Sequence, residues 1–218
     1  MQVPEIESAA IVMLGSFNPA IFQPQWLGVR KLIRAEEAEN AKITVIQSEL
    51  ADFSTEWFQL QVLQGRFMVT CTDPRQHAPL RDLAGGIFTL LPHTPVTRVG
   101  LNRSFHFGTP STESWHRIGH RRAPKEPWES LMEMPGLRSM LIQGRQKELS
   151  DGVLHIKVEP SVKIDRGLFV EVNEEFQSAA KGEDEGAYWV PDLLTARWDA
   201  ILKFAEVAAN HLLELGNE

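Results

Sequence analysis

The residues best suited to chemistry are six basic side chains between positions 98 and 125. They are Arg98, Arg103, Arg117, Arg121, Arg122 and Lys125, and Glu113 is the only acid in that interval. The whole chain of 218 residues carries a net charge of −7, so the interval is strongly polarised against the rest. Guanidinium groups gathered in this way bind phosphate, a nucleic-acid backbone or an acidic protein surface. The alternative is that they pair with acidic residues of the same molecule, and the sequence leaves both interpretations open.

Two histidines in the same interval are four residues apart. His116 and His120 would share one face of a helix, which is the spacing that lets two imidazoles hold one metal ion. The zinc-protease motif needs a glutamate directly after the first histidine, and Arg117, a cation that repels a metal, stands there. No third ligand can be named. The sequence therefore favours solvent-facing or hydrogen-bonding histidines over a metal site.

The candidate ligand-binding residues are accordingly the five arginines and the two histidines. They are Arg98, Arg103, Arg117, Arg121, Arg122, His116 and His120. No catalytic residue and no cofactor is predicted, because the sequence has no phosphate loop, no dinucleotide fingerprint and no Gly-x-Ser-x-Gly elbow. Cys71 is the single cysteine and lies in an apolar run, so we expect a buried structural thiol.

Composition limits the class of protein. Hydrophobic residues make up 43% of the chain and charged residues 23%, as in an ordinary globular protein. The negative net charge argues against a general nucleic-acid binder, which normally carries a positive field. The apolar stretch at 9–14 is too short for a signal or membrane helix, so we expect a cytoplasmic protein with no membrane partner.

Apolar periodicity predicts the elements that must position these residues. In the first half we expect strands at 9–14, 43–50, 58–62 and 67–72, and helices at 23–39 and 79–91. In the second half we expect strands at 96–107, 137–144, 153–158 and 168–172, a helix from 109 to Ala123-Pro124, a short helix at 127–132 and a long helix at 191–215. A polar loop is expected at 181–186. In the long helix, Trp198, Ile201 and Leu202 share the apolar stripe and should be buried.

The order strand–helix–three strands–helix thus occurs twice, in residues 1–95 and again in residues 96–218. It predicts an α+β fold of two similar halves that form a curved, mostly antiparallel sheet with helices on one face, as one compact unit. The order resembles the duplicated saddle of TATA-binding-like folds, a resemblance of fold and not of function. The turn at 108–110 should bring Arg103 near Arg117 and Arg121.

Five short segments carry a second resemblance. They are Phe17-Asn18-Pro19-Ala20-Ile21-Phe22, Thr55-Glu56-Trp57-Phe58, Pro79-Leu80-Arg81-Asp82-Leu83, Asn102-Arg103-Ser104-Phe105-His106-Phe107 and Ala123-Pro124-Lys125-Glu126-Pro127-Trp128. The chain resembles, over most of its length, a family of hypothetical bacterial proteins of similar size. That resemblance implies a bacterial, cytoplasmic setting and brings no activity, cofactor or catalytic residue with it.

Three functional hypotheses follow. The favoured one is a non-enzymatic binding or adaptor protein that contacts another protein or itself, such as a subunit of a bacterial assembly. It is favoured because no nucleophile–base set, cofactor loop or complete metal set can be named. The second is a nucleic-acid or phosphate-ligand binder that uses the basic segment 98–125. The third is a metal-assisted hydrolase that uses His116 and His120.

Overall fold

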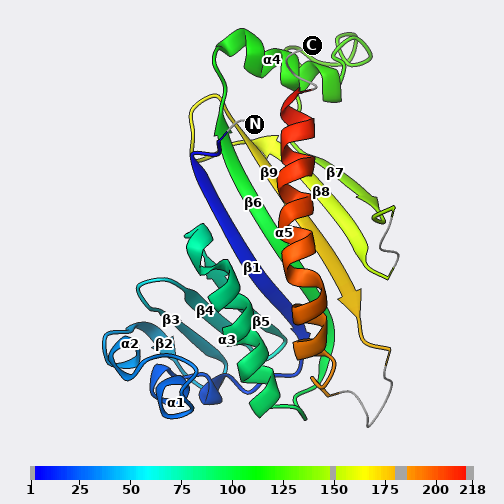
Figure 1. Cartoon of the computed structure of the whole chain (residues 1–218). Coiled ribbons are helices and arrows are strands. Elements are labelled where there is room, and N and C mark those ends of the chain that lie inside the picture. Colours follow the sequence, from blue (N-terminus) through cyan, green and yellow to red (C-terminus); the bar gives the residue numbers. More distant parts are fainter. Residues whose placement is uncertain (1–2, 148–150, 180–185, 215–218) are drawn as a thin grey trace. The chain divides into compact units, whose positions relative to one another are not determined.

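The structure is a computed structural model that describes residues 3–147, 151–179 and 186–214 (Figure 1). The described strands are β1 (Ile6–Gly15), β2 (Lys42–Ile46), β3 (Leu50–Ser54), β4 (Gln59–Leu63), β5 (Arg66–Cys71), β6 (Val96–Gly108), β7 (Met140–Gly144), β8 (Val153–Pro160) and β9 (Gly167–Gln177). The helices are α1 (Pro24–Val29), α2 (Ala35–Glu39), α3 (His77–Leu90), α4 (Thr112–Arg122) and α5 (Val190–Glu214), and single 3-10 turns occur at Pro19–Ile21 and Pro74–Gln76.

The described strands form one open sheet of nine strands in the order β2-β3-β4-β5-β1-β6-β9-β8-β7. The pairings β2–β3, β3–β4, β4–β5, β1–β5 and β7–β8 are all antiparallel. Because the sheet is not closed, β2 and β7 each have one edge without a neighbouring strand. The predicted α+β class with a mostly antiparallel sheet is confirmed. In the part of the chain described, no helix is long and apolar enough to cross a membrane.

Contacts divide the chain into two compact units that are not consecutive in sequence. The α3 unit comprises Ser8–Asn102 and Glu174–Ile201, and the α4 unit comprises Met1–Glu7, Arg103–Asn173 and Leu202–Glu218. The chain passes from one unit to the other within β1, β6, β9 and α5. The boundary predicted at 95/96 is not the division that contacts give. The order strand–helix–three strands–helix is found in residues 96–218 but not in residues 1–95, where four strands follow the first helices, and the structural similarity of the two halves stays a prediction.

In the α3 unit, alternate residues of the strands face a helical layer. Leu60 and Val62 of β4 are fully buried, and α3 lies against β5 (Figure 1). The Trp198 indole of α5 donates a hydrogen bond of 2.9 Å to the carbonyl of His77, which joins α5 to the start of α3. Trp198 and Ile201 are fully buried. Leu202, the first α5 residue of the α4 unit, is also buried, so the predicted stripe is confirmed.

The core of the α4 unit lies between β6, β8, β9 and the second half of α5. The side chains that form it are Phe105, Phe107, Ile118, Leu154, Val158, Leu168, Val170, Val172, Ala205, Ala209 and Leu213. Small alanines on α5 let the helix approach the strands closely, while the strands supply the bulk. Ile118 of α4 belongs to this core and Met140 of β7 packs against it, so the core holds both elements in place.

Three local predictions were wrong. The helix expected at 23–39 is two short helices, because Lys31 has a left-handed backbone (φ 57°) between α1 and α2. The strand expected at 43–50 is a hairpin of β2 and β3, so four strands and not three follow the first helices. Residues 127–132 form hydrogen-bonded turns and no helix. Most of the polar loop predicted at 181–186 lies outside the described residues.

Candidate functional site

The structure separates the two basic residues that β6 carries. Arg98 lies in the α3 unit, where its guanidinium is 3.6 Å from the carboxylate of Glu175. Its side chain is 49% exposed, so this pair contributes little to stability. Arg98 is therefore paired within the protein and only half accessible to a ligand.

Arg103 lies inside the α4 unit and is held on several sides. Its guanidinium donates to the Glu7 carboxylate at 2.8 Å and to the Leu202 carbonyl at 2.8 Å, and lies 3.4 Å from the Glu206 carboxylate. The guanidinium carbon is 4.8 Å from the centre of the Phe105 ring. The side chain is 8% exposed. A buried cation needs such partners, so Arg103 has a structural role and does not face a surface ligand.

Arg122, at the end of α4, is also used internally. It donates 2.8 Å to the Ile118 carbonyl and also donates to the carbonyl of Leu212, which ties α4 to α5. Burial lowers the pKa of this guanidinium. The basic end of α4 further suits the negative end of the helix dipole, while Ser111 caps its start by accepting from the Ser114 amide at 3.1 Å.

Arg117 and Arg121 are the members of the arginine set that lie exposed on α4. They are four residues apart, so two like charges share one helical face. The predicted cluster of Arg103, Arg117 and Arg121 does not form an open site, because Arg103 points into the unit. The reason is visible in the sequence: Arg103 is in phase with Leu101 and Phe105 on β6, both of which are buried.

His116 and His120 line the same hollow. His120 lies 3.4 Å from the Glu126 carboxylate, and its side chain is 44% exposed. His116 is exposed and meets the Trp115 ring edge-on at 5.0 Å between ring centres. Within the described residues, no group of three or more His, Cys, Asp or Glu side chains could hold a metal ion.

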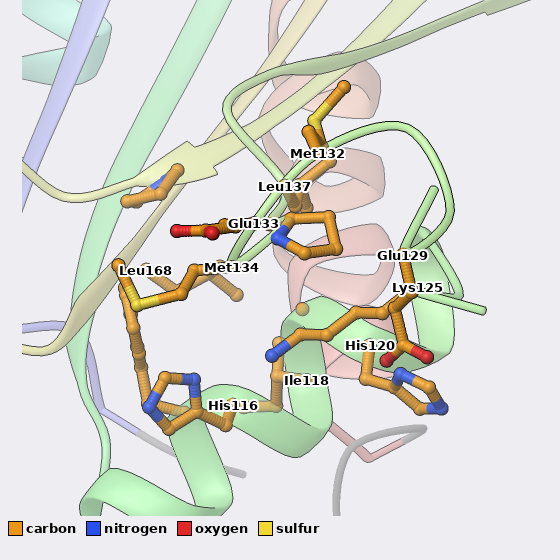
Figure 2. Close-up of a pocket in the computed structure, with 15 residues that line it drawn as sticks. His116, Ile118, His120, Lys125, Glu129, Met132, Glu133, Met134, Leu137 and Leu168 are labelled. Atoms are coloured by element: carbon orange, nitrogen blue, oxygen red, sulfur yellow. The ribbon is translucent and has the colours of Figure 1, made fainter. Parts of the chain in front are cut away.

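The hollow itself is a cavity of about 790 Å³ in the α4 unit. Its wall consists of α4, the turns after it, and the ends of β8 and β9, through Trp115, His116, Ile118, Gly119, His120, Lys125, Glu129, Met132, Glu133, Met134, Pro135, Gly136, Leu137, Pro160 and Leu168. Figure 2 shows the Lys125 side chain extending into the hollow. Ile118 and Leu168 are among the apolar residues that line the hollow. A cavity of this size with mixed apolar and charged walls suits either a small molecule or a protruding side chain of a partner.

A set of exposed apolar side chains continues from this hollow along the chain. The 128–142 surface is defined by Trp128, Leu131, Met132, Met134, Leu141 and Ile142. Met134 is 95% exposed and Leu131 73% exposed, whereas apolar residues of the strands are mostly buried. The sequence analysis missed this surface, because it assigned 127–132 to a short helix and 137–144 to a strand and did not ask which of their apolar side chains would be covered.

One hydroxyl–imidazole pair was also missed by the sequence reasoning. The Ser161 hydroxyl is 2.8 Å from Nδ1 of His106, and burial lowers the pKa of that histidine. The hydroxyl oxygen already accepts from the amides of Lys163 and Ile164 at 3.1 and 3.0 Å. Both of its lone pairs are thus engaged, which suits a turn and not a nucleophile.

A second, smaller hollow lies in the α3 unit and is lined by Arg34, Glu37, Glu56, Trp57, Thr72, Asp73, Arg75 and Gln76. Several of these polar residues pair with one another. Glu37 accepts from Arg34 at 3.0 Å and from the Trp57 indole at 3.0 Å, and Asp73 accepts from Arg75 at 2.7 Å. Cys71 is buried, as predicted. These groups stabilise local turns and present no reactive set.

Comparison with known proteins adds no relative whose site could be set beside this one. No protein-family model and no curated protein matches this chain. The resemblance to a family of hypothetical bacterial proteins therefore stays a prediction.

Proposed function

We propose that the protein is a non-enzymatic binding or adaptor protein, a subunit of a larger assembly, and that a partner protein docks on the 128–142 surface. The observation that carries the proposal is the concentration of exposed, large apolar side chains in this one stretch. Leu131, Met134 and Ile142 are 73%, 95% and 55% exposed. Large exposed apolar side chains gathered in one segment of a folded protein favour a site of interaction. Leu141 and Ile142 are consecutive residues of β7 and face opposite sides of the sheet, so the docking surface centres on the side chains between Trp128 and Met134.

The hollow beside this surface supports the same proposal. Protein interfaces gain most of their energy from a few large side chains that fill pockets in the partner. The hollow has apolar walls in Met132, Leu137 and Leu168 and charged groups in Lys125 and Glu129. An apolar centre with polar margins is the usual composition of an interface.

The other two hypotheses have less support. Nucleic-acid binding requires several cations free to neutralise phosphates, yet Arg103 and Arg122 bind groups of the protein and Arg98 is paired with Glu175. A steep fall in affinity with added salt would be its signature. A metal-assisted hydrolase would need a third ligand beside His116 and His120, and the described residues supply none that completes a set.

The test is a comparison of captured proteins between matched variants. The immobilised protein is exposed to an extract of its native cells, and co-eluting proteins are identified. The double variant Leu131→Lys/Met134→Lys should lose a stoichiometric partner that the wild type retains. The control is Val29→Lys in the α3 unit, where Val29 is 80% exposed. Retention of every partner by the double variant, or equal loss in both variants, would overturn the proposal.

A further inference from the structure

The large hollow of the α4 unit has one wall that is part of the folded core. Ile118 of α4 and Leu168 of β9 belong to that core and also line the hollow. The Trp115 indole lines it as well and donates a hydrogen bond of 3.1 Å to the carbonyl of Gly167. Because these side chains are fixed by packing and by a hydrogen bond, this wall is formed before any ligand arrives.

The rest of the lining adds further apolar surface. Met132, Pro135 and Leu137, from the turns after α4, line the same hollow. Its volume of about 790 Å³ lies within the range of small-molecule sites. A peptide backbone would find few hydrogen-bond partners on apolar walls, and unpaired polar groups are costly to bury. The lining therefore suits a small molecule with an apolar body better than a segment of peptide.

One charged group in this lining has no counter-charge from the protein. Lys125 is half-buried, and Figure 2 shows its side chain extending into the hollow toward the side where His116 and Leu168 lie. Its backbone is held in a turn, because its carbonyl accepts from the amides of Trp128 and Glu129 at 2.8 and 3.2 Å. Within the described residues, the Lys125 ammonium forms no ion pair. An ammonium partly removed from water is stabilised by a nearby anion, and a ligand can supply it.

The acidic residues of the hollow do not take this role. Glu129 and Glu133 line it, but both are exposed, so their carboxylates remain hydrated and need no partner. Figure 2 shows the Glu129 carboxylate on the side of His120, away from the ammonium end of Lys125. A cationic ligand that entered the hollow would meet the like charge of Lys125. The half-buried charge therefore favours an anionic ligand.

We propose that the hollow of the α4 unit binds a small monocarboxylate with an apolar body, and that Lys125 is its counter-ion. The apolar body packs between the core wall and the turns that carry Met132 and Leu137. The His116 imidazole forms no hydrogen bond within the described part of the chain and can donate to the same carboxylate. This inference goes beyond the proposed function, because it assigns a small ligand to the hollow beside the surface on which the partner docks.

The probe is decanoate, a monocarboxylate with an unbranched apolar chain. Its binding to the full chain is measured by isothermal titration calorimetry, below the concentration at which micelles form. Decanol has the same chain without a charge, and decylammonium has the opposite charge. We expect decanoate to bind at a single site and both control ligands to bind at least about tenfold more weakly, because neither accepts a charge-assisted hydrogen bond from Lys125.

Matched variants decide whether this hollow is the site. Lys125→Met removes the ammonium and keeps the apolar stem, so it should weaken decanoate at least about tenfold and leave decanol unchanged. Lys163→Met changes an exposed lysine of the same unit outside the hollow and should bind decanoate like the wild type. Leu137→Asn should weaken both decanoate and decanol, because it removes apolar wall. Thermal unfolding shows that the variants are folded.

Three results would overturn the proposal. They are the absence of decanoate binding by the wild type, equal weakening by Lys125→Met and Lys163→Met, and equal affinities for decanoate and decylammonium.

This proposal and the proposed function can fail separately. If decanoate binds through Lys125 while Leu131→Lys/Met134→Lys retains every captured partner, the ligand site stands and docking on the surface is wrong. If decanoate does not bind and Lys125→Met loses the captured partner, the hollow receives a side chain of that partner and the ligand site is wrong.

Discussion

The interior around Arg103 and the 128–142 surface place polar and apolar side chains in opposite ways. Arg103 is a cation in the core, and Leu131 and Met134 are apolar groups in solvent. The buried cation is supplied with carboxylates and a carbonyl, whereas the exposed apolar groups have no cover within the described residues. The charge of Arg103 is thus satisfied inside the protein, whereas Leu131 and Met134 expose apolar surface to solvent. For this reason the exposed apolar side chains are better candidates for a binding site than Arg103.

The largest expected effect is a loss of stability from a substitution in the interior around Arg103. Arg103→Met removes one member of a buried ion pair and leaves the Glu7 carboxylate without its partner. We expect the free energy of unfolding to fall by about 3–4 kcal/mol, measured by urea denaturation. The double variant Arg103→Met/Glu7→Gln should recover much of this loss. A loss below about 1 kcal/mol for the single variant would show that Arg103 is not structural.

A smaller effect is expected at the second buried polar pair. Ser161→Ala removes the acceptor of the Lys163 and Ile164 amides and the contact to His106. The expected cost is about 1–2 kcal/mol, seen as a lower denaturation midpoint. Ser161→Thr keeps the hydroxyl and should retain most of the stability. An unchanged denaturation midpoint in Ser161→Ala would show that the hydrogen bonds of this turn do not stabilise the fold.

The same pair should make stability depend on pH. Burial, with a smaller contribution from the charge of Lys163, lowers the pKa of His106 in the folded state. The unfolded chain therefore takes up this proton first as pH falls below the ordinary histidine pKa of about 6.5, and stability is lost until the folded pKa is reached. His106→Gln should lose less stability between neutral and mildly acidic pH than the wild type. If the stabilities of the wild type and of His106→Gln changed in parallel with pH, the imidazole of His106 would not be buried and neutral.

The smallest effect should come from the apolar surface. Leu131→Lys/Met134→Lys should change the free energy of unfolding by no more than about 0.5 kcal/mol, because both side chains are already in water. Thermal denaturation beside Val29→Lys provides the comparison. A large destabilisation by the double variant alone would mean that these residues pack within the unit, and the contrast with the interior would disappear.

The candidate site was only partly predictable. The burial of Arg103 could have been read from β6, since the residue falls in phase with Leu101 and Phe105. Its partners could not, because Glu7 and Glu206 are about a hundred positions away in the chain. For the 128–142 surface, the pattern predicted a short helix and a strand, and β7 lies within that predicted strand. The exposure of the apolar side chains and their place beside the hollow did not follow, because both depend on which other segments cover them.

The sequence by itself determined the elements with strong periodicity. The stripe of Trp198 and Ile201 predicts α5, and the alternation around Leu60 predicts β4, because local spacing alone decides which side chains share a face. Tertiary structure decided the rest. Lys31 breaks the first helix in two, Arg103 is neutralised internally, and β7 is left at the end of the sheet. The ion pairs of Arg103 and the place of β7 depend on which distant segments meet, because strand order and ion pairing across a fold are set by packing that no local pattern encodes. The break at Lys31 is local, and its left-handed backbone was not visible in the apolar pattern.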